Sequence, residues 1–386
     1  MHFQARVELA KSRPAQLDMV TFDYAPDIFL PAHYPQIQQR AAGVLALSFE
    51  VFLHQQTDEI FFVLSSAEHK KGANMIMSAF YHIMLAHKCS AHEGAGATAL
   101  AVQTDRGLEN VCFGSLSMTN AAMVDVGWYK STLRSALLVG HTHCPVDQVG
   151  GTGRQAIKRL TCVNTLVDVV RALKASHQNR PVSVIFVKSS HDWVTFFEKL
   201  KPTQFSGYTN VLQFRTFPNP DPTGVPLTQY RDWAESQEFW TGSGGQRHGA
   251  PLQIWNSRLD AKELPQPIPA QPLYEEEKFA KVCGGIRKHY QFMSSDQVSQ
   301  WETVLSEGSL SSMIHVVEDS VCDDPTRPGQ LGFVQDIDPS GVERREFIRV
   351  IDLLPSELWK IPTHANNAPS ALAPTRLDEG TEYLWS

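Results

Sequence analysis

The chain has 386 residues, of which 42% are hydrophobic and 19% are charged, and its formal net charge is −7. This length and composition are typical of a globular protein with one large core and a smaller module. A chain with this negative charge has no overall attraction to nucleic acid, so such a partner would require a local basic patch or metal ions.

The six cysteines are scattered and form no Cys-x-x-Cys pair, which excludes a dense disulfide framework and indicates an intracellular location. The first residues lack the apolar core of a signal peptide, and no stretch approaches the roughly 18 apolar residues of a membrane span. We therefore expect no membrane role. The sequence has no Lys/Arg-rich run, so the nucleus stays a candidate location without a targeting motif that would predict it.

Apolar, β-branched runs and helical spacing divide the first half of the chain into alternating elements. The predicted elements, in chain order, are strands at 17–24, 43–53 and 59–65, a helix at 72–88, a strand at 97–104, a helix in the mixed segment after it, a strand at 136–140 and a helix at 146–159. This order predicts an α/β fold with a ribonuclease-H-like mixed sheet of about five strands, flanked by helices. The first three strands should be antiparallel, and the strands ending at Thr104 and Gly140 should run parallel to the first.

The second half of the sequence predicts further helices and strands that lie around the same core. The composition then changes. Helices at 164–176 and 191–200 surround a strand at 182–188, and another strand is expected at 211–217. Pro- and Gly-rich stretches follow. We therefore divide the chain into a ribonuclease-H-like domain (1–241), a linker (242–273) and a small, mainly helical C-terminal extension (274–386). The extension should hold a helical hairpin at 275–307, a short β-hairpin at 332–354 and a mobile tail at 364–374.

Three acids stand at predicted strand ends that this topology would bring together. Asp23 ends the first strand, Asp105 ends the fourth, and Asp147 comes just after the fifth. Clustered carboxylates hold the divalent cations that stabilise both the attacking and the leaving oxygen in phosphoryl transfer. The three acids are therefore the predicted catalytic and metal-binding residues, with Mg²⁺ or Mn²⁺ as the cofactor and DNA as the candidate partner.

Four short motifs follow one another in the first two-thirds of the chain. They are Thr21-Phe22-Asp23-Tyr24-Ala25, Lys71-Gly72-Ala73-Asn74, Gln103-Thr104-Asp105 with Asn110, and Val139-Gly140-His141-Thr142-His143 with Asp147-Gln148. In this order they resemble a eukaryotic transposase-derived family of unknown function, whose motifs typically read D-F-A, K-G-A-N, D-N-C-x-x-Q-N-K-N and V-G-H-T-H-x-x-x-D-Q. The resemblance implies a ribonuclease-H-like nuclease or strand-transfer domain, and it adds His141 and His143 as metal ligands and Asn110 as a further site residue.

The departures from this pattern favour an alternative in which the site is degenerate. Arg106-Gly107 replaces the family's Asn-Cys, and the Q-N-K-N stretch is reduced to Glu109-Asn110-Val111-Cys112. An arginine beside Asp105 would compete with a metal ion, which leaves a domesticated, non-catalytic binding or assembly module as the alternative.

The individual residues also have structural explanations. Asp23 and Asp105 can be ordinary turn acids, and Asp147 can be a first-turn acid that the helix dipole favours. His141 and His143 can cap the following helix, and Asn74 can belong to a helix start rather than to a phosphate-binding loop.

Gly140-His141-Thr142-His143 also resembles the metal-binding end of calcineurin-like metallophosphoesterases, which is the second alternative. The partner motifs of that family, Asp-x-His, Gly-Asp and Gly-Asn-His, are missing upstream. A deubiquitinase-type metalloprotease is excluded, because Gly151 and Arg154 stand where its serine and aspartate would be. No motif indicates a small-molecule cofactor, and the sequence predicts no oligomeric state.

Overall fold

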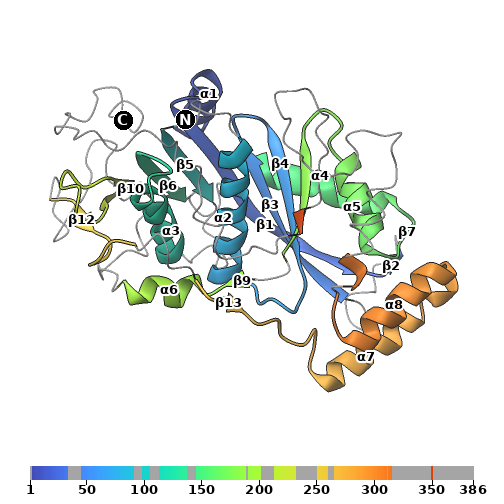
Figure 1. Ribbon diagram of the computed structural model, residues 1–386. Helices are drawn as coiled ribbons and strands as arrows, with labels where there is room; N and C mark the ends of the chain where they lie inside the picture. The colour runs from blue at the N-terminus through green and yellow to red at the C-terminus, as the bar shows by residue number, and fades with distance from the viewer. Residues whose placement is uncertain are drawn as a thin grey trace, which may run out of the picture.

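The computed structural model describes residues 2–33, 45–90, 98–104, 113–136, 145–187, 190–200, 213–231, 250–259, 265–310, 312–314 and 349–350. A ten-stranded mixed sheet runs through these residues in the order β12-β11-β10-β6-β5-β1-β3-β4-β8-β14. Helices cover both faces of the sheet (Figure 1). None of the helices in these ranges is long and apolar enough to cross a membrane.

Five neighbouring strands at the centre of the sheet have the predicted arrangement. They are β1 (Leu17–Leu30), β3 (Leu45–His54), β4 (Glu59–Ser65), β5 (Ala99–Thr104) and β6 (Ser131–Ala136). β1 pairs with β3 and β3 with β4 antiparallel, whereas β5 runs parallel to β1 and β6 parallel to β5. The order β4-β3-β1-β5-β6, with these directions, is that of a ribonuclease-H-like sheet, so the predicted fold class is confirmed.

Strand β6 lies earlier in the sequence than predicted. It ends at Ala136, the first residue of the predicted 136–140 strand, and residues 137–144 lie outside the described part of the chain. The sequence of β6 is mostly polar, yet all six residues are buried between β5 and β10. The Arg134 guanidinium bonds Thr104 Oγ1 at 3.4 Å, and Gln103 Nε2 bonds the Ser135 carbonyl at 3.1 Å. A hydrophobicity pattern cannot detect a strand whose inner positions are hydrogen-bonded polar residues.

The sheet is wider than the predicted five strands because it is extended at both edges. The additional strands are β10 (Gln213–Phe217), β11 (Leu227–Arg231) and β12 (Leu252–Gln253) beside β6, and β8 (Val182–Val187) and β14 (Arg349–Val350) beside β4. The predicted β-hairpin at 332–354 lies outside the described residues except for β14, and the tail at 364–374 lies outside them entirely. Two short pairs, β2 (Ala32–His33) with β7 (Cys162–Val163) and β9 (Ser190–His191) with β13 (Pro267–Ile268), stand apart from the main sheet.

Side chains that alternate along β1 define two core layers. Val20 and Phe22 pack with α2 (Ala73–Ser90), and the same layer includes residues of α3 (Phe113–Asp125) and α6 (Trp193–Lys199). Leu17 and Met19 pack against α1 (His2–Ser12) on the opposite face. Beyond α1 on that face, β3 and β4 are covered by α4 (Pro145–Arg159) and α5 (Leu166–Ala175). Most of the predicted helices are therefore present, with ends that move by a few residues.

The C-terminal helical hairpin shares this second layer rather than forming a core of its own. It consists of α7 (Glu276–Arg287), the 3-10 turn η5 (Tyr290–Phe292) and α8 (Ser295–Glu307). Ile286 and Trp301 belong to the core cluster of α4 and α5, and Trp301 Nε1 donates to the Asn164 carbonyl at 2.8 Å. Of the predicted linker, residues 250–259 and 265–273 contain only β12 and β13 as regular structure. The linker therefore marks a change in secondary structure, and the hairpin after it packs on the main domain.

Candidate functional site

Asp23 lies beside the ends of β5 and β6, at one edge of the parallel strands. The prediction that Asp23 ends the first strand is wrong, because β1 continues past it to Leu30 in its pairing with β3. The backbone register pairs Phe22 of β1 with Thr104 of β5, and Thr104 with Ala136 of β6. Phe22 packs toward α2 and Ala25 packs toward α4, so the alternation of a strand places Asp23 on the α4 face. This is the edge that the sequence predicted for the acidic cluster.

Helix α4 brings Asp147 to the same place because glycine allows the helix to approach the sheet. A Cβ atom at Gly150 would lie 3.2 Å from Val51 Cγ2 and 3.4 Å from Ala25 Cβ, and one at Gly153 would lie 3.1 Å from Phe62 Cζ. Asp147 stands one turn before Gly150 in the first turn of α4, where the helix dipole favours a negative charge. The glycine face of α4 therefore fixes the position of Asp147 relative to β1.

Asp23 and Asp147 line one small cavity of about 130 Å³. Asp23 is half-buried, and its Oδ1 accepts a hydrogen bond from the Tyr24 backbone N–H at 2.7 Å. Asp147 is exposed. Two of the three predicted acids are thus brought together from elements that are distant in the sequence.

Arg154 lines the same cavity, although it was not among the residues predicted for the site. It stands seven residues after Asp147, which is two turns along α4 and on the same face of the helix. The spacing is the signal that could have identified it, once the helix was known to lie on the acidic edge. A guanidinium in this cavity can bind a phosphate oxygen or can neutralise the two carboxylates.

The second motif lies beside the first. Lys71 Nζ is 2.6 Å from Asp27 Oδ1 and 5.5 Å from the centre of the Tyr24 ring, and Tyr24 lines the cavity. Asn74 has the structural role that was considered for it: its Oδ1 accepts from the Val194 N–H at 2.9 Å, which ties α2 to α6. Of this motif, only Lys71 reaches a residue that lines the cavity.

The remaining predicted site residues, Asp105, Asn110, His141 and His143, lie outside the described part of the chain, as does Arg106. Within the described ranges, no group of three His, Cys, Asp or Glu side chains could hold a metal ion. The oxygens of Asp23 and Asp147 fit the donor preference of Mg²⁺ or Mn²⁺, but two carboxylates alone do not complete a site. Asp105 and the two histidines remain predicted ligands.

Another acid on β1, Asp18, lies near the start of the strand in a buried network. His54 Nε2 contacts one Asp18 oxygen, Tyr129 Oη donates to the other at 2.7 Å, and His54 Nδ1 is 2.7 Å from Thr57 Oγ1. Asp18 and His54 are each only 1% exposed. Burial, followed by the charge of Asp18, raises the pKa of Tyr129 well above its usual value. The bonds at both oxygens of Asp18 indicate a structural role for this network.

The fold and the site define a mixed α/β domain with ribonuclease-H-like sheet order and two acids in one cavity beside the ends of the parallel strands β5 and β6. Residues 44–236, which are half of the chain, match a family described as a domain of unknown function, DUF7869, and the chain belongs to this family. The match contains Asp105, His141, His143 and Asp147, and it begins after Asp23. Neither the curated proteins nor the solved structures gave a match to the chain.

Proposed function

We propose that this domain is transposase-derived and catalyses metal-dependent phosphoryl transfer on DNA, as a nuclease or strand-transfer domain, with Asp23, Asp105 and Asp147 as its carboxylates. The observation that carries the proposal is the shared cavity of Asp23 and Asp147 beside the point where β5 and β6 end next to β1. Phosphoryl transfer needs carboxylates that converge in this way, whereas turn acids have no reason to converge.

The chain's own residues would act mainly by positioning. The Tyr24 N–H orients the Asp23 carboxylate, and the contact of Gly150 with β1 and β3 sets the position of Asp147. Arg154 can donate hydrogen bonds to phosphate oxygens from the same cavity. A bound Mg²⁺ or Mn²⁺ would supply the charge stabilisation of the attacking and leaving oxygens.

Arg154 also supports a second candidate function, a non-catalytic binding or assembly module. A guanidinium turned between Asp23 and Asp147 would occupy the place of a cation and leave the acids neutralised. The calcineurin-like alternative gains no comparable support, because it depends on His141 and His143, which lie outside the described residues.

The test is Mg²⁺- and Mn²⁺-dependent cleavage of supercoiled DNA by the purified full chain and four variants. We expect D23N, D105N and D147N each to lower the rate by about a hundredfold or more, because each removes a ligand whose effect on the barrier is several kcal/mol. D58N is the matched control. Asp58 lies in the turn between β3 and β4, and its φ of 54° is one that asparagine adopts readily. Cleavage by D23N and D147N at the wild-type rate would refute the proposed site.

The variant R154Q separates the two candidate functions by the sign of its effect. If Arg154 binds the phosphate of the substrate, R154Q should cleave more slowly, by about tenfold or more. If Arg154 neutralises the acids, wild type should cleave little DNA, and R154Q should bind Mn²⁺ more tightly than wild type does. The second result would establish the binding module in place of the nuclease.

A further inference from the structure

The helices next to the acidic cavity carry positive charge in an acidic chain. Residues 145–180 contain six lysines and arginines, whereas the whole chain has 34 basic and 41 acidic residues. The six are Arg154, Lys158, Arg159, Arg171, Lys174 and Arg180. The same stretch has only two acids, Asp147 and Asp168. Asp168 Oδ2 already accepts the backbone N–H groups of Asn164 and Thr165 at the start of α5, at 2.8 and 3.0 Å.

The basic residues of α4 continue from the cavity along one side of the helix. Asp147, Gly151, Arg154 and Lys158 follow at intervals of four, three and four residues, which places them on one face. In the part of the chain that the structure describes, no carboxylate pairs with Arg154, Lys158 or Arg159. From Asp147 to Lys158 the helix axis extends about 16 Å, the axial length of about five base pairs of DNA.

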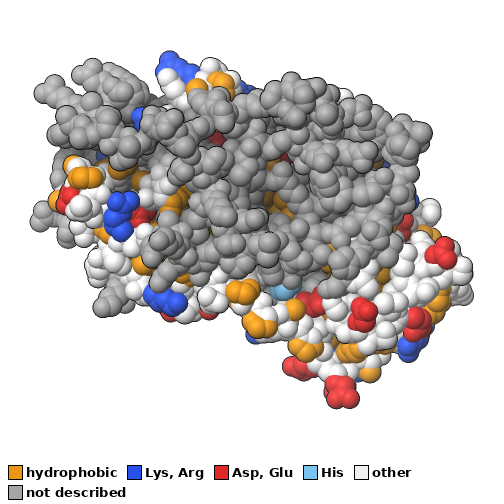
Figure 2. Space-filling view, viewed as in Figure 1, with side chains coloured by type: hydrophobic (Ala, Val, Ile, Leu, Met, Phe, Trp, Pro, Cys, Tyr) orange, Lys and Arg blue, Asp and Glu red, His pale blue; other side chains and the backbone are white. Residues whose placement is uncertain are grey.

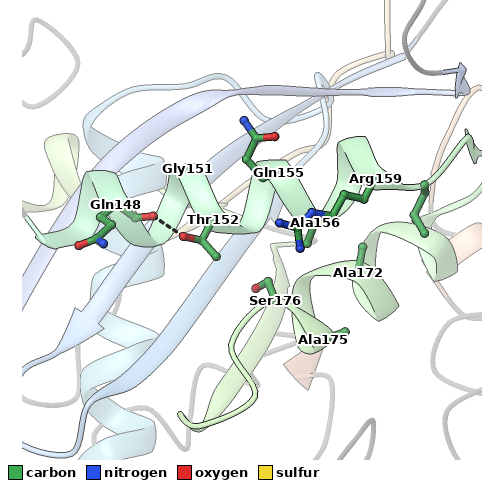
Figure 3. Close-up of a pocket in the computed structure, with 10 residues that line it drawn as sticks. Gln148, Gly151, Thr152, Gln155, Ala156, Arg159, Ala172, Ala175 and Ser176 are labelled. Atoms are coloured by element: carbon green, nitrogen blue, oxygen red, sulfur yellow. Dashed lines mark hydrogen bonds between the residues drawn. The ribbon is translucent and has the colours of Figure 1, made fainter.

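A second, larger cavity lies next to this face of α4, between α4 and α5 (Figure 3). Its volume is about 540 Å³. It is lined by Gln148, Gly151, Thr152, Gln155, Ala156, Arg159, Leu160, Ala172, Ala175 and Ser176. Figure 3 shows the Arg159 side chain running back along α4 toward Ala156. The lining thus combines small residues with groups that can donate hydrogen bonds.

Gly151 connects the two cavities because it lines both of them. A Cβ atom at this position would meet nothing within 4 Å, so the helix backbone is open to the outside here. Because residue 151 is a glycine, it places no side chain between the larger cavity, which is the groove between α4 and α5, and the cavity of Asp23 and Asp147.

The acidic side chains gather on a different part of the molecule. Figure 2 shows them over the hairpin of α7 and α8. Glu275, Glu276, Glu277, Asp296, Glu302 and Glu307 are all exposed there. The net charge of −7 is therefore compatible with a basic surface on α4.

We infer that the exposed face of α4 and the groove between α4 and α5 form the track on which the phosphate backbone of a DNA duplex lies as it enters the cavity of Asp23 and Asp147. The inference rests on the proposed function, since it names the surface that delivers the substrate to that site. An anionic membrane is the less suitable partner, because membrane binding needs apolar side chains beside the basic ones. Among the described residues the one exposed large hydrophobic side chain is Phe292, which lies in the hairpin.

The test is fluorescence polarisation of a labelled 20-base-pair DNA duplex, titrated with the full chain in EDTA at several salt concentrations. EDTA prevents metal-dependent cleavage, so binding is measured apart from catalysis. The variant R154Q/K158Q/R159Q removes three charges from the track, and K278Q/K281Q/R287Q removes the same number from α7. We expect the first to lower the affinity about tenfold or more and to reduce the slope of log K against log salt by about three. The second should bind as wild type does.

Each result decides the inference separately from the proposed function. Wild-type binding by the α4 variant, or no binding by wild-type protein, would overturn the track, and so would equal losses in both variants. The inference would also be overturned if the α4 variant lost affinity for anionic phospholipid vesicles and wild type bound no DNA. If the α4 variant alone loses DNA binding while wild type cleaves no DNA with Mg²⁺ or Mn²⁺, the track is supported and the nuclease proposal fails.

Discussion

Two of the three aspartates on strand β1, Asp18 and Asp23, have opposite surroundings. Asp18 is 1% exposed, and both of its oxygens are engaged, by His54 and Tyr129. Asp23 is half-buried and opens onto a cavity that it shares with Asp147 and Arg154. The same residue type on one strand thus lies in a buried network near the start of the strand and beside a cavity farther along it. The difference comes from what the neighbouring elements bring to each aspartate.

The largest expected stability effect would test this contrast directly. Asp18→Ala should lower the free energy of unfolding by about 3–5 kcal/mol, because it leaves His54 and Tyr129 buried without their common partner. Asp23→Ala should change it by less than about 1 kcal/mol, since that carboxylate is half-buried beside a cavity. Urea unfolding of the two variants measures both values, and equal losses would show that the two aspartates do not differ in their contribution to stability.

A smaller effect is expected from the phenol that bonds Asp18. Tyr129→Phe keeps the ring and removes the 2.7 Å hydrogen bond, which should reduce stability by about 1–3 kcal/mol. The same measurement on Tyr230→Phe is the control, because Tyr230 lies in the outer strand β11 with intermediate exposure. A neutral Tyr129→Phe would mean that Asp18 depends on His54 alone.

The raised pKa of Tyr129 predicts a loss of stability in alkali. Because the folded-state pKa lies above the unfolded value near 10, the stabilisation is complete below pH ~10 and falls as pH rises above it, by up to about 1.4 kcal/mol per pH unit. Thermal unfolding between pH 8 and 11 should therefore show a steeper decline for wild type than for Tyr129→Phe. Parallel curves would contradict the buried network.

The smallest effect is expected at the other end of β1. Lys71 and Asp27 form an ion pair whose side chains are 34% and 32% exposed, and solvent screens such pairs. Lys71→Ala should therefore cost about 1 kcal/mol or less, even though Lys71 belongs to one of the four motifs. A loss as large as that of Asp18→Ala would show that Lys71 has a structural role that its contacts do not explain.

The sequence predicted the central sheet well because its strands and helices bury regular apolar faces. Residues 17–22 of β1 and Glu59–Ser65 follow that rule, whereas the less buried continuation of β1 to Leu30 was not predicted. Strand β6 does not follow it either, since Arg134 and Ser135 fill its buried positions. The candidate site was predicted in part. Asp23 and Asp147 could be placed from the strand order, but the Asp18 network and the place of Arg154 depend on packing between distant segments, which one sequence does not reveal.

Mn²⁺ binding by the full chain tests the central claim most directly, because it asks whether Asp23 and Asp147 bind the kind of ion that the proposed function needs. Electron paramagnetic resonance of free Mn²⁺ at pH 7 gives the affinity of wild type, D23N, D147N and D58N. We predict saturable binding by wild type and D58N, and affinities at least about tenfold weaker in D23N and D147N, since each loses a charged oxygen ligand. Equal Mn²⁺ affinity in all four proteins, or none in wild type, would contradict the assignment of Asp23 and Asp147 to a metal site.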